Sequence, residues 1–195
     1  MPRRTTRPVP PAVAAPPRQD GFTMVELIVV IVLVGILSAI GASRFFDRTG
    51  FDVAAFAEQG RSMLRYAQKL AIAQNRPVYV QVLGNIEGFG LCFSAAAPCA
   101  PADQVPAPSG ANSGSATTRK LCLAGGVYTE RWSCEGWPVG SKFNPKSGTM
   151  SPFFYNGLGQ PVPTGGGTFA GLTVIIDGGG VSNQISVSQE TGYVY

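Results

Sequence analysis

Histidine is absent from the 195-residue chain, and only 13% of the residues are charged. Histidine is the commonest general base and the commonest metal ligand at neutral pH. No other pattern replaces it, because the sequence shows neither a phosphate-binding P-loop nor a pair of neighbouring carboxylates after the N-terminal region. The sequence therefore predicts no enzymatic activity, no catalytic residue, no bound metal and no cofactor.

Net positive charge is scarce beyond the N-terminus, although the formal charge of the chain is +4. Residues 1–21 hold four of the 15 basic residues and one of the 11 acidic residues, which leaves +1 for the remainder. Neutralising phosphates requires exposed Lys and Arg, so we do not expect a nucleic-acid partner. DNA binding is kept as an alternative because one cluster of basic residues remains: Arg119, Lys120, Arg131, Lys142 and Lys146.

Cysteine is absent from the first 91 residues and then occurs four times, as Cys92, Cys99, Cys122 and Cys134. An even number of cysteines in an exported domain favours disulfide bonds. Four cysteines allow three pairings, and we favour the two local ones, Cys92 with Cys99 and Cys122 with Cys134. A zinc site is the alternative, but the chain has neither a Cys-x-x-Cys pair nor a histidine to support it.

One long apolar stretch, residues 21–42, contains a single charged residue, Glu26. About 20 apolar residues span a bilayer as a helix, and a carboxylate within such a helix is costly and usually functional. Arginines precede the stretch, which predicts a cytoplasmic N-terminus and a periplasmic or extracellular C-terminal domain. Residues 1–20 are rich in proline and are predicted to be disordered. A plain signal anchor is the simplest alternative, but it explains neither Gly21 nor Glu26.

The start of the apolar stretch, Gly21-Phe22-Thr23-Met24-Val25-Glu26-Leu27, resembles the class III signal of type IV pilins and type II secretion pseudopilins. The resemblance implies that a prepilin peptidase cuts between Gly21 and Phe22 and methylates the new amino group of Phe22. It also implies that Glu26 docks against the terminal amine of a neighbouring subunit in a filament. The chain departs from the family in its long, proline-rich leader, which ends in Gln19-Asp20 where family members often have Lys or Arg.

Helical periodicity resumes beyond the apolar stretch and predicts an amphipathic helix over residues 43–76. Asn75 and Pro77 are typical of a helix C-terminus. A helix continuous from Phe22 would have roughly 50 residues and measure about 80 Å, with Gly41 or Gly50 supplying any bend. The predicted core stripe consists of Val53, Phe56, Met63, Leu64, Ala67, Leu70 and Ala71. The residues off the stripe are Arg61, Arg65, Gln68 and Lys69. The three basic ones among them are predicted to face solvent or another subunit.

Residues 77–195 are rich in Gly, Pro and short β-prone runs, which predicts a β-rich domain with a long surface loop over residues 95–118. A turn near 84–88 is expected to join the first two strands, and Gly178-Gly179-Gly180 is expected to join a later pair. The predicted strands are 78–82, 89–93, 120–123, 127–132, 153–155, 173–177, 184–188 and 193–195. The predicted class is α+β, a pilin-like "lollipop" in which a long helix packs on an antiparallel sheet.

Residues 65–78 resemble the junction between helix and first strand in the GspH/FimT group of minor pilins and pseudopilins. Residues 154–161 resemble the hairpin of that group, and residues 185–187 with 191–194 resemble its closing strand pair. Arg44-Phe45-Phe46 and the run over residues 65–71 resemble the C-type minor pilins of mannose-sensitive haemagglutinin (MSHA) pili.

The sequence thus divides into a cleaved leader (1–21), a transmembrane and filament-core helix (22–42), an amphipathic helix (43–76) and a β-rich domain (77–195). The resemblance implies a minor pilin of an MSHA-like type IV pilus, held in the bacterial inner membrane until it joins the filament. Its implied partners are other pilins, prepilin peptidase and the inner-membrane assembly platform. Two alternatives stay open, a GspH-type pseudopilin of a type II secretion system and a FimT-like DNA-binding minor pilin.

Overall fold

A computed structural model describes residues 21–45, 48–84, 87–147 and 152–195; the side chains of 39–45 and 144–147 are not described. Residues 1–20, which the sequence predicts to be disordered, lie outside the described ranges. The chain forms two compact units, residues 1–45 and residues 46–195. The α+β class predicted from the sequence is confirmed, because the second unit combines a long helix with antiparallel sheets.

The first unit contains one described helix, α1 (Met24–Phe45), and the second unit begins with α2 (Thr49–Gln74). The sequence allows one continuous helix with any bend at Gly41 or Gly50; α1 ends at Phe45 and α2 begins at Thr49, and residues 46–47 between them lie outside the described residues. Asn75 ends α2 as predicted. It adopts a left-handed conformation with φ of 46°, and the Arg76 N–H after it bonds Ala71 O at 3.2 Å.

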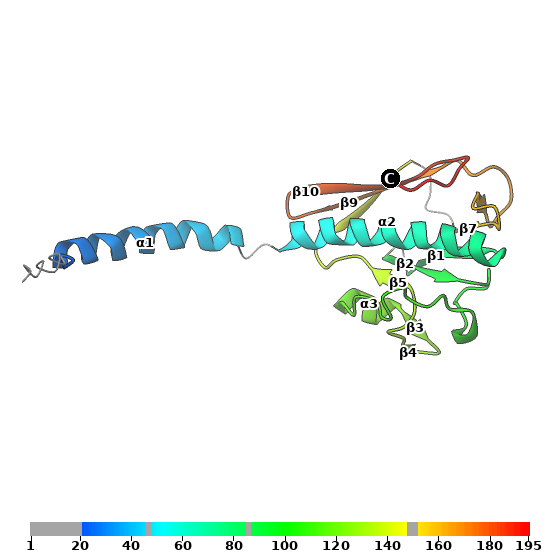
Figure 1. Ribbon diagram of the computed structural model, residues 1–195, viewed down its shortest axis with the longest axis horizontal. Helices are drawn as coiled ribbons and strands as arrows, with labels where there is room; N and C mark the ends of the chain where they lie inside the picture. The colour runs from blue at the N-terminus through cyan, green and yellow to red at the C-terminus, as the bar shows by residue number, and fades with distance from the viewer. Residues whose placement is uncertain (1–20, 46–47, 85–86, 148–151) are drawn as a thin grey trace, which may run out of the picture. The chain divides into compact units, whose positions relative to one another are not determined.

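Two main antiparallel sheets pack with α2 in the second unit (Figure 1). The larger sheet has the order β5-β2-β1-β7-β8 and the smaller has the order β10-β9-β6. The strands of the larger sheet are β1 (Val78–Leu83), β2 (Gly88–Cys92), β5 (Cys134–Gly136), β7 (Phe153–Tyr155) and β8 (Pro161–Pro163). Those of the smaller sheet are β6 (Lys142–Ser147), β9 (Leu172–Gly178) and β10 (Val181–Val187).

The predicted hairpins are confirmed, since β1 pairs with β2 and β9 pairs with β10 across Gly179-Gly180. The predicted strand at 193–195 is wrong. This segment forms only an isolated bridge, Val187 to Val194, although Ser186 and Tyr195 exchange two backbone hydrogen bonds. The sequence did not predict β5, β6 or β8, which are short or contain proline.

The face of the larger sheet toward α2 carries the main core. Val80 pairs with Leu91 and with Phe153, so these side chains share one face, and α2 supplies the opposing residues of the same cluster. The buried residues of α2 are Val53, Phe56, Ala57, Gly60, Met63, Leu64, Ala67 and Ala71. The predicted stripe is therefore confirmed, apart from Leu70, which is only partly buried. In the same core, burial of the ring raises the pKa of the Tyr155 phenol.

Residues 93–133, which we call the insert, pack against β2 and β5 of the larger sheet, and Val105 of the insert belongs to the main core. A second small core lies on the face of the sheet away from α2, where Tyr79 and Leu83 of β1 pack against Trp132 and the four cysteines. The insert contains a 3-10 turn (Pro101–Asp103), α3 (Ala116–Leu121) and a hairpin of β3 (Leu123–Ala124) and β4 (Val127–Tyr128).

The expected surface loop over 95–118 is largely confirmed, since no strand of the two main sheets lies there and most of its residues are exposed. Val105 is nevertheless buried at 0% exposure, and Gln104 and Pro106 form isolated bridges with Cys92 and Trp132. The expected strand over 120–123 is mostly the last turn of α3, because Ser115 caps this helix by accepting the Thr118 N–H at 3.2 Å. Of the expected strand 127–132, only Val127–Tyr128 forms.

Polar residues of α2 hydrogen-bond to the backbone of their own domain, although Arg65 and Lys69 are exposed as the sequence predicts and Arg61 is half-buried. The Arg65 guanidinium donates to Val194 O at 2.9 and 3.1 Å, and Arg61 donates to Gln184 O. Gln68 donates to Gly159 O at 2.9 Å and to Thr191 O at 2.8 Å. These side chains tie the C-terminal segment to the helix.

Gly90 allows the insert to approach the sheet closely. A Cβ atom at this position would lie 2.7 Å from Cζ2 of Trp132, whose indole N–H donates to Leu91 O at 2.8 Å. We predict that Gly90→Ala lowers the free energy of unfolding by about 2–3 kcal/mol, because overpacking displaces a buried ring.

Urea unfolding measures this loss. Gly165→Ala is the matched control, since a Cβ there meets nothing within 4 Å, and it should leave stability within about 0.5 kcal/mol. Equal effects of the two substitutions would contradict the close packing of Trp132 on β2.

Candidate functional site

The predicted processing residues lie just before α1. Residues 21–23 have no helical structure, and the helix starts at Met24. Thr23 accepts the backbone N–H of Glu26 at 3.2 Å. This Thr-x-x-Glu spacing is that of a capping box, which places the Glu26 carboxylate in the first turn, where the helix dipole favours negative charge.

Gly21 and Phe22 are open to solvent. A Cβ at Gly21 would meet no atom within 4 Å, and Phe22 is 83% exposed. The fold of the described residues therefore does not require glycine at position 21. Glycine at position 21 would be required by an external molecule that must approach the backbone closely, because glycine has no Cβ to obstruct contact.

The apolar side chains of α1 have no packing partner among the described residues. Its large hydrophobic residues from Met24 to Leu37 are each exposed by half or more. Over the same described ranges, no helix is both long enough and apolar enough to cross a membrane. Glu26 is likewise exposed, and no ion pair involving it is found in this part of the structure.

Both local disulfide pairs favoured by the sequence are present. Cys92 is bonded to Cys99 with a Cα–Cα distance of 6.0 Å, and Cys122 is bonded to Cys134 at 5.8 Å. No free cysteine is left, so the zinc alternative has no thiolate ligand. The first bond closes the start of the insert, and the second joins the residue after α3 to the first residue of β5.

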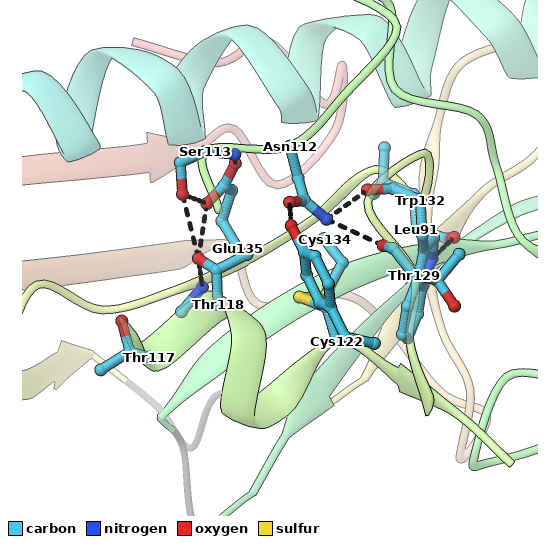
Figure 2. The surroundings of a disulfide bond; sticks show 12 residues. Leu91, Asn112, Ser113, Thr117, Thr118, Cys122, Thr129, Trp132, Cys134 and Glu135 are labelled. Carbon is cyan, nitrogen blue, oxygen red and sulfur yellow. Dashed lines mark hydrogen bonds between the residues drawn. A yellow bond between two sulfur atoms is a disulfide. The ribbon is translucent and has the colours of Figure 1, made fainter. Parts of the chain in front are cut away.

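Glu135, which the sequence analysis did not single out, lies beside the second disulfide (Figure 2). Its side chain is 1% exposed and pairs with Phe89 across β5 and β2, on the α2 face of the sheet. Its Oε1 accepts the Ser113 N–H at 2.7 Å and the Gln59 amide. Its Oε2 accepts the Thr118 hydroxyl at 2.8 Å and the Ser113 hydroxyl.

These hydrogen bonds fasten α2 to the insert at one carboxylate: Gln59 comes from α2, Ser113 from the loop of the insert before α3, and Thr118 from α3. Thr118 also accepts the Gly136 N–H at 3.1 Å. Asn112 continues the network and donates to Thr129 O at 3.0 Å and Trp132 O at 3.3 Å (Figure 2). No periodicity marks these residues in the sequence, because the cluster is assembled from segments that lie far apart.

The basic residues considered for DNA binding come from separate elements. Arg119 and Lys120 are on α3, whereas Lys142 is on β6. Arg119 donates to Gly114 O at 2.8 Å, and Lys120 lies 3.6 Å from the Glu87 carboxylate. The side chain of Lys146 is outside the described residues.

The second disulfide should stabilise the insert measurably. We predict that replacing both Cys122 and Cys134 with serine lowers the free energy of unfolding by about 3 kcal/mol, the chain-entropy value for a loop of this length. Thermal unfolding of the double variant checks this result. A melting temperature that responds to a chelator and not to dithiothreitol would contradict the disulfide.

Comparison with known proteins bears on the N-terminal segment first. Residues 16–42 match a family described as the prokaryotic N-terminal methylation motif. The N-terminal segment carries this methylation motif. The motif covers Gly21, Phe22 and Glu26 and includes most of α1.

A curated relative and two solved structures are also similar. The chain is 40% identical over 73 residues to the type IV narrow pilus major component PilA5 of Thermus thermophilus. That match covers 36% of this chain and 63% of the relative, so the chain spans less than two thirds of the relative's length.

Two crystal structures of the type IV minor pilin FimU of Pseudomonas aeruginosa, strain PAO1, match at 18% identity, with TM-scores of 0.44 and 0.43. They cover 74% and 73% of this chain, and 87% and 90% of the solved chains.

Proposed function

We propose that this chain is a structural, non-enzymatic minor pilin, processed after Gly21 and built into a type IV pilus of the MSHA-like kind. The observation that carries the proposal is the open Gly21-Phe22 segment directly before a capped apolar helix with Glu26 in its first turn. This arrangement coincides with the matched methylation motif.

Processing by prepilin peptidase explains the glycine. The described fold leaves space for a side chain at position 21, so the need for glycine comes from the enzyme that must reach the scissile bond. Cleavage there makes Phe22 the methylated N-terminus, and the leader stays in the cytoplasm.

Storage and assembly explain the bare surface of α1. Transfer of its exposed apolar side chains from water into an apolar environment is favourable. The inner membrane provides that environment before assembly, and neighbouring pilin helices provide it afterwards. The two disulfides fit a domain that matures in the oxidising periplasm. The partners are therefore other pilins, prepilin peptidase and the assembly platform in the inner membrane.

Coexpression with a prepilin peptidase tests the proposal. We predict that Gly21→Val reduces leader removal at least tenfold, as measured by the mass shift of the intact chain. Gly35→Val is the matched control, because this glycine also lies in the apolar segment and a Cβ there meets nothing within 4 Å. Normal cleavage of Gly21→Val, or loss of cleavage in both variants, would refute the assigned site.

A further inference from the structure

Two neighbouring cavities lie along one side of α2 and share Gln59 in their walls. The first has a volume of about 300 Å³ and extends to Asp52, with Ser113 and Thr117 of the insert in its wall. The second has a volume of about 270 Å³ and extends to Met63, with Ala111 in its wall. Together they form a groove between α2 and the insert, which we call the α2 groove.

The α2 groove contains negative charge and no positive charge. Asp52 lines the first cavity and Glu135 lines the second, and neither wall includes Lys or Arg. Glu135 is almost fully buried, and all four of its hydrogen-bond donors among the described residues are neutral. Because buried charges are normally paired with an opposite charge, the groove is suited to a cation.

Gln59 is the donor to Glu135 that a cation could replace. It is half-buried, it comes from α2, and its amide lies where the two cavities meet. The other donors belong to the insert and include a backbone N–H. Movement of the Gln59 side chain would join the two cavities and free one position at Oε1 of Glu135.

We propose that the α2 groove binds a basic segment of a partner subunit, whose Lys or Arg side chain replaces the Gln59 amide at Glu135. The groove follows α2 from Asp52 to Met63, about 16 Å at 1.5 Å per residue. An extended segment of about five residues has this length. Phe56 and Met63 in the walls provide apolar contacts. The inference rests on the proposed function only in naming the partner as another subunit.

An NMR titration tests the inference. The full chain, labelled at its methionine methyl carbons and held in detergent micelles, is titrated with a peptide. The probe is the acetylated and amidated pentapeptide Ala-Val-Arg-Val-Ala, and its control carries uncharged citrulline in place of arginine. We expect the arginine peptide to shift the Met63 signal saturably, with a Kd at least tenfold lower than that of the citrulline peptide. Met24, which lies in the other unit, should not shift.

Variants separate charge recognition from other binding. Asp52→Asn should weaken binding of the arginine peptide at least threefold, whereas Glu190→Gln, an exposed carboxylate outside the groove walls, should not change it. Gln59→Ala should strengthen binding, because it removes the competing donor. Equal binding of both peptides, or no binding of either, would overturn the inference. Leader cleavage in the same preparations reports on the proposed function independently, since the groove takes no part in it.

Discussion

Glu135→Ala should lower the free energy of unfolding by about 4 kcal/mol, the largest stability effect we expect from one substitution in the insert. Removing the carboxylate takes away the acceptor that four donors share: the Ser113 N–H and hydroxyl, the Thr118 hydroxyl and the Gln59 amide. Losing one partner of a buried charged network typically costs about 3–5 kcal/mol.

Glu135→Gln should cost less, about 1–2 kcal/mol. Its amide oxygen can keep the bonds made at Oε1, and its NH₂ group would then face two hydroxyls that can turn to accept. Glu130→Ala is the control, because Glu130 is an exposed carboxylate of the insert, and it should change stability by less than about 0.5 kcal/mol.

Urea unfolding followed by tryptophan fluorescence measures these differences, since Trp132 and Trp137 both lie in buried positions. Equal stabilities of Glu135→Ala and Glu130→Ala would show that the carboxylate does not fasten the insert to α2.

Glu26→Ala should reduce incorporation into filaments at least tenfold without changing leader cleavage. The side chain is exposed in the first turn of α1 and has no ion-pair partner in the described structure. In an assembled filament it needs a cation, because a carboxylate in an apolar environment is costly. The terminal amine of Phe22 on a neighbouring subunit fills that need in the proposed arrangement.

Quantifying the subunit in sheared filaments and in membranes gives the ratio that tests this prediction. Glu26→Gln should resemble Glu26→Ala, because it removes the charge with little change in size. Glu190→Gln should assemble normally. Wild-type assembly of Glu26→Ala would exclude a docking role for the carboxylate.

Periodic segments of the chain could be predicted well. The spacing of apolar residues over 53–71 matches the face of α2 that is buried, because helical spacing is a local property of the sequence. The pairs β1–β2 and β9–β10 follow from β-branched runs separated by turn residues. The N-terminal methylation motif can likewise be recognised from the sequence, because its residues are contiguous.

Apart from its two disulfides, the packing of the insert could not be predicted, because contacts distant in sequence determine it. Residues 95–118 are rich in small residues and carry no periodic signal, yet Val105 is buried and Ser113 bonds Glu135 across 22 positions. The close fit of Trp132 on Gly90 is likewise invisible in the sequence. The acceptor of the Arg65 guanidinium is equally distant in sequence, since it is the backbone carbonyl of Val194.

The N-terminus of the protein in its filament tests the central claim most directly. Chain recovered from sheared filaments would be digested and its first peptide identified by mass spectrometry. The account predicts a peptide that begins at Phe22, carries one added methyl group on its amine and lacks all of residues 1–21. A recovered chain that still contains Gly21, or that begins at another residue, would contradict it.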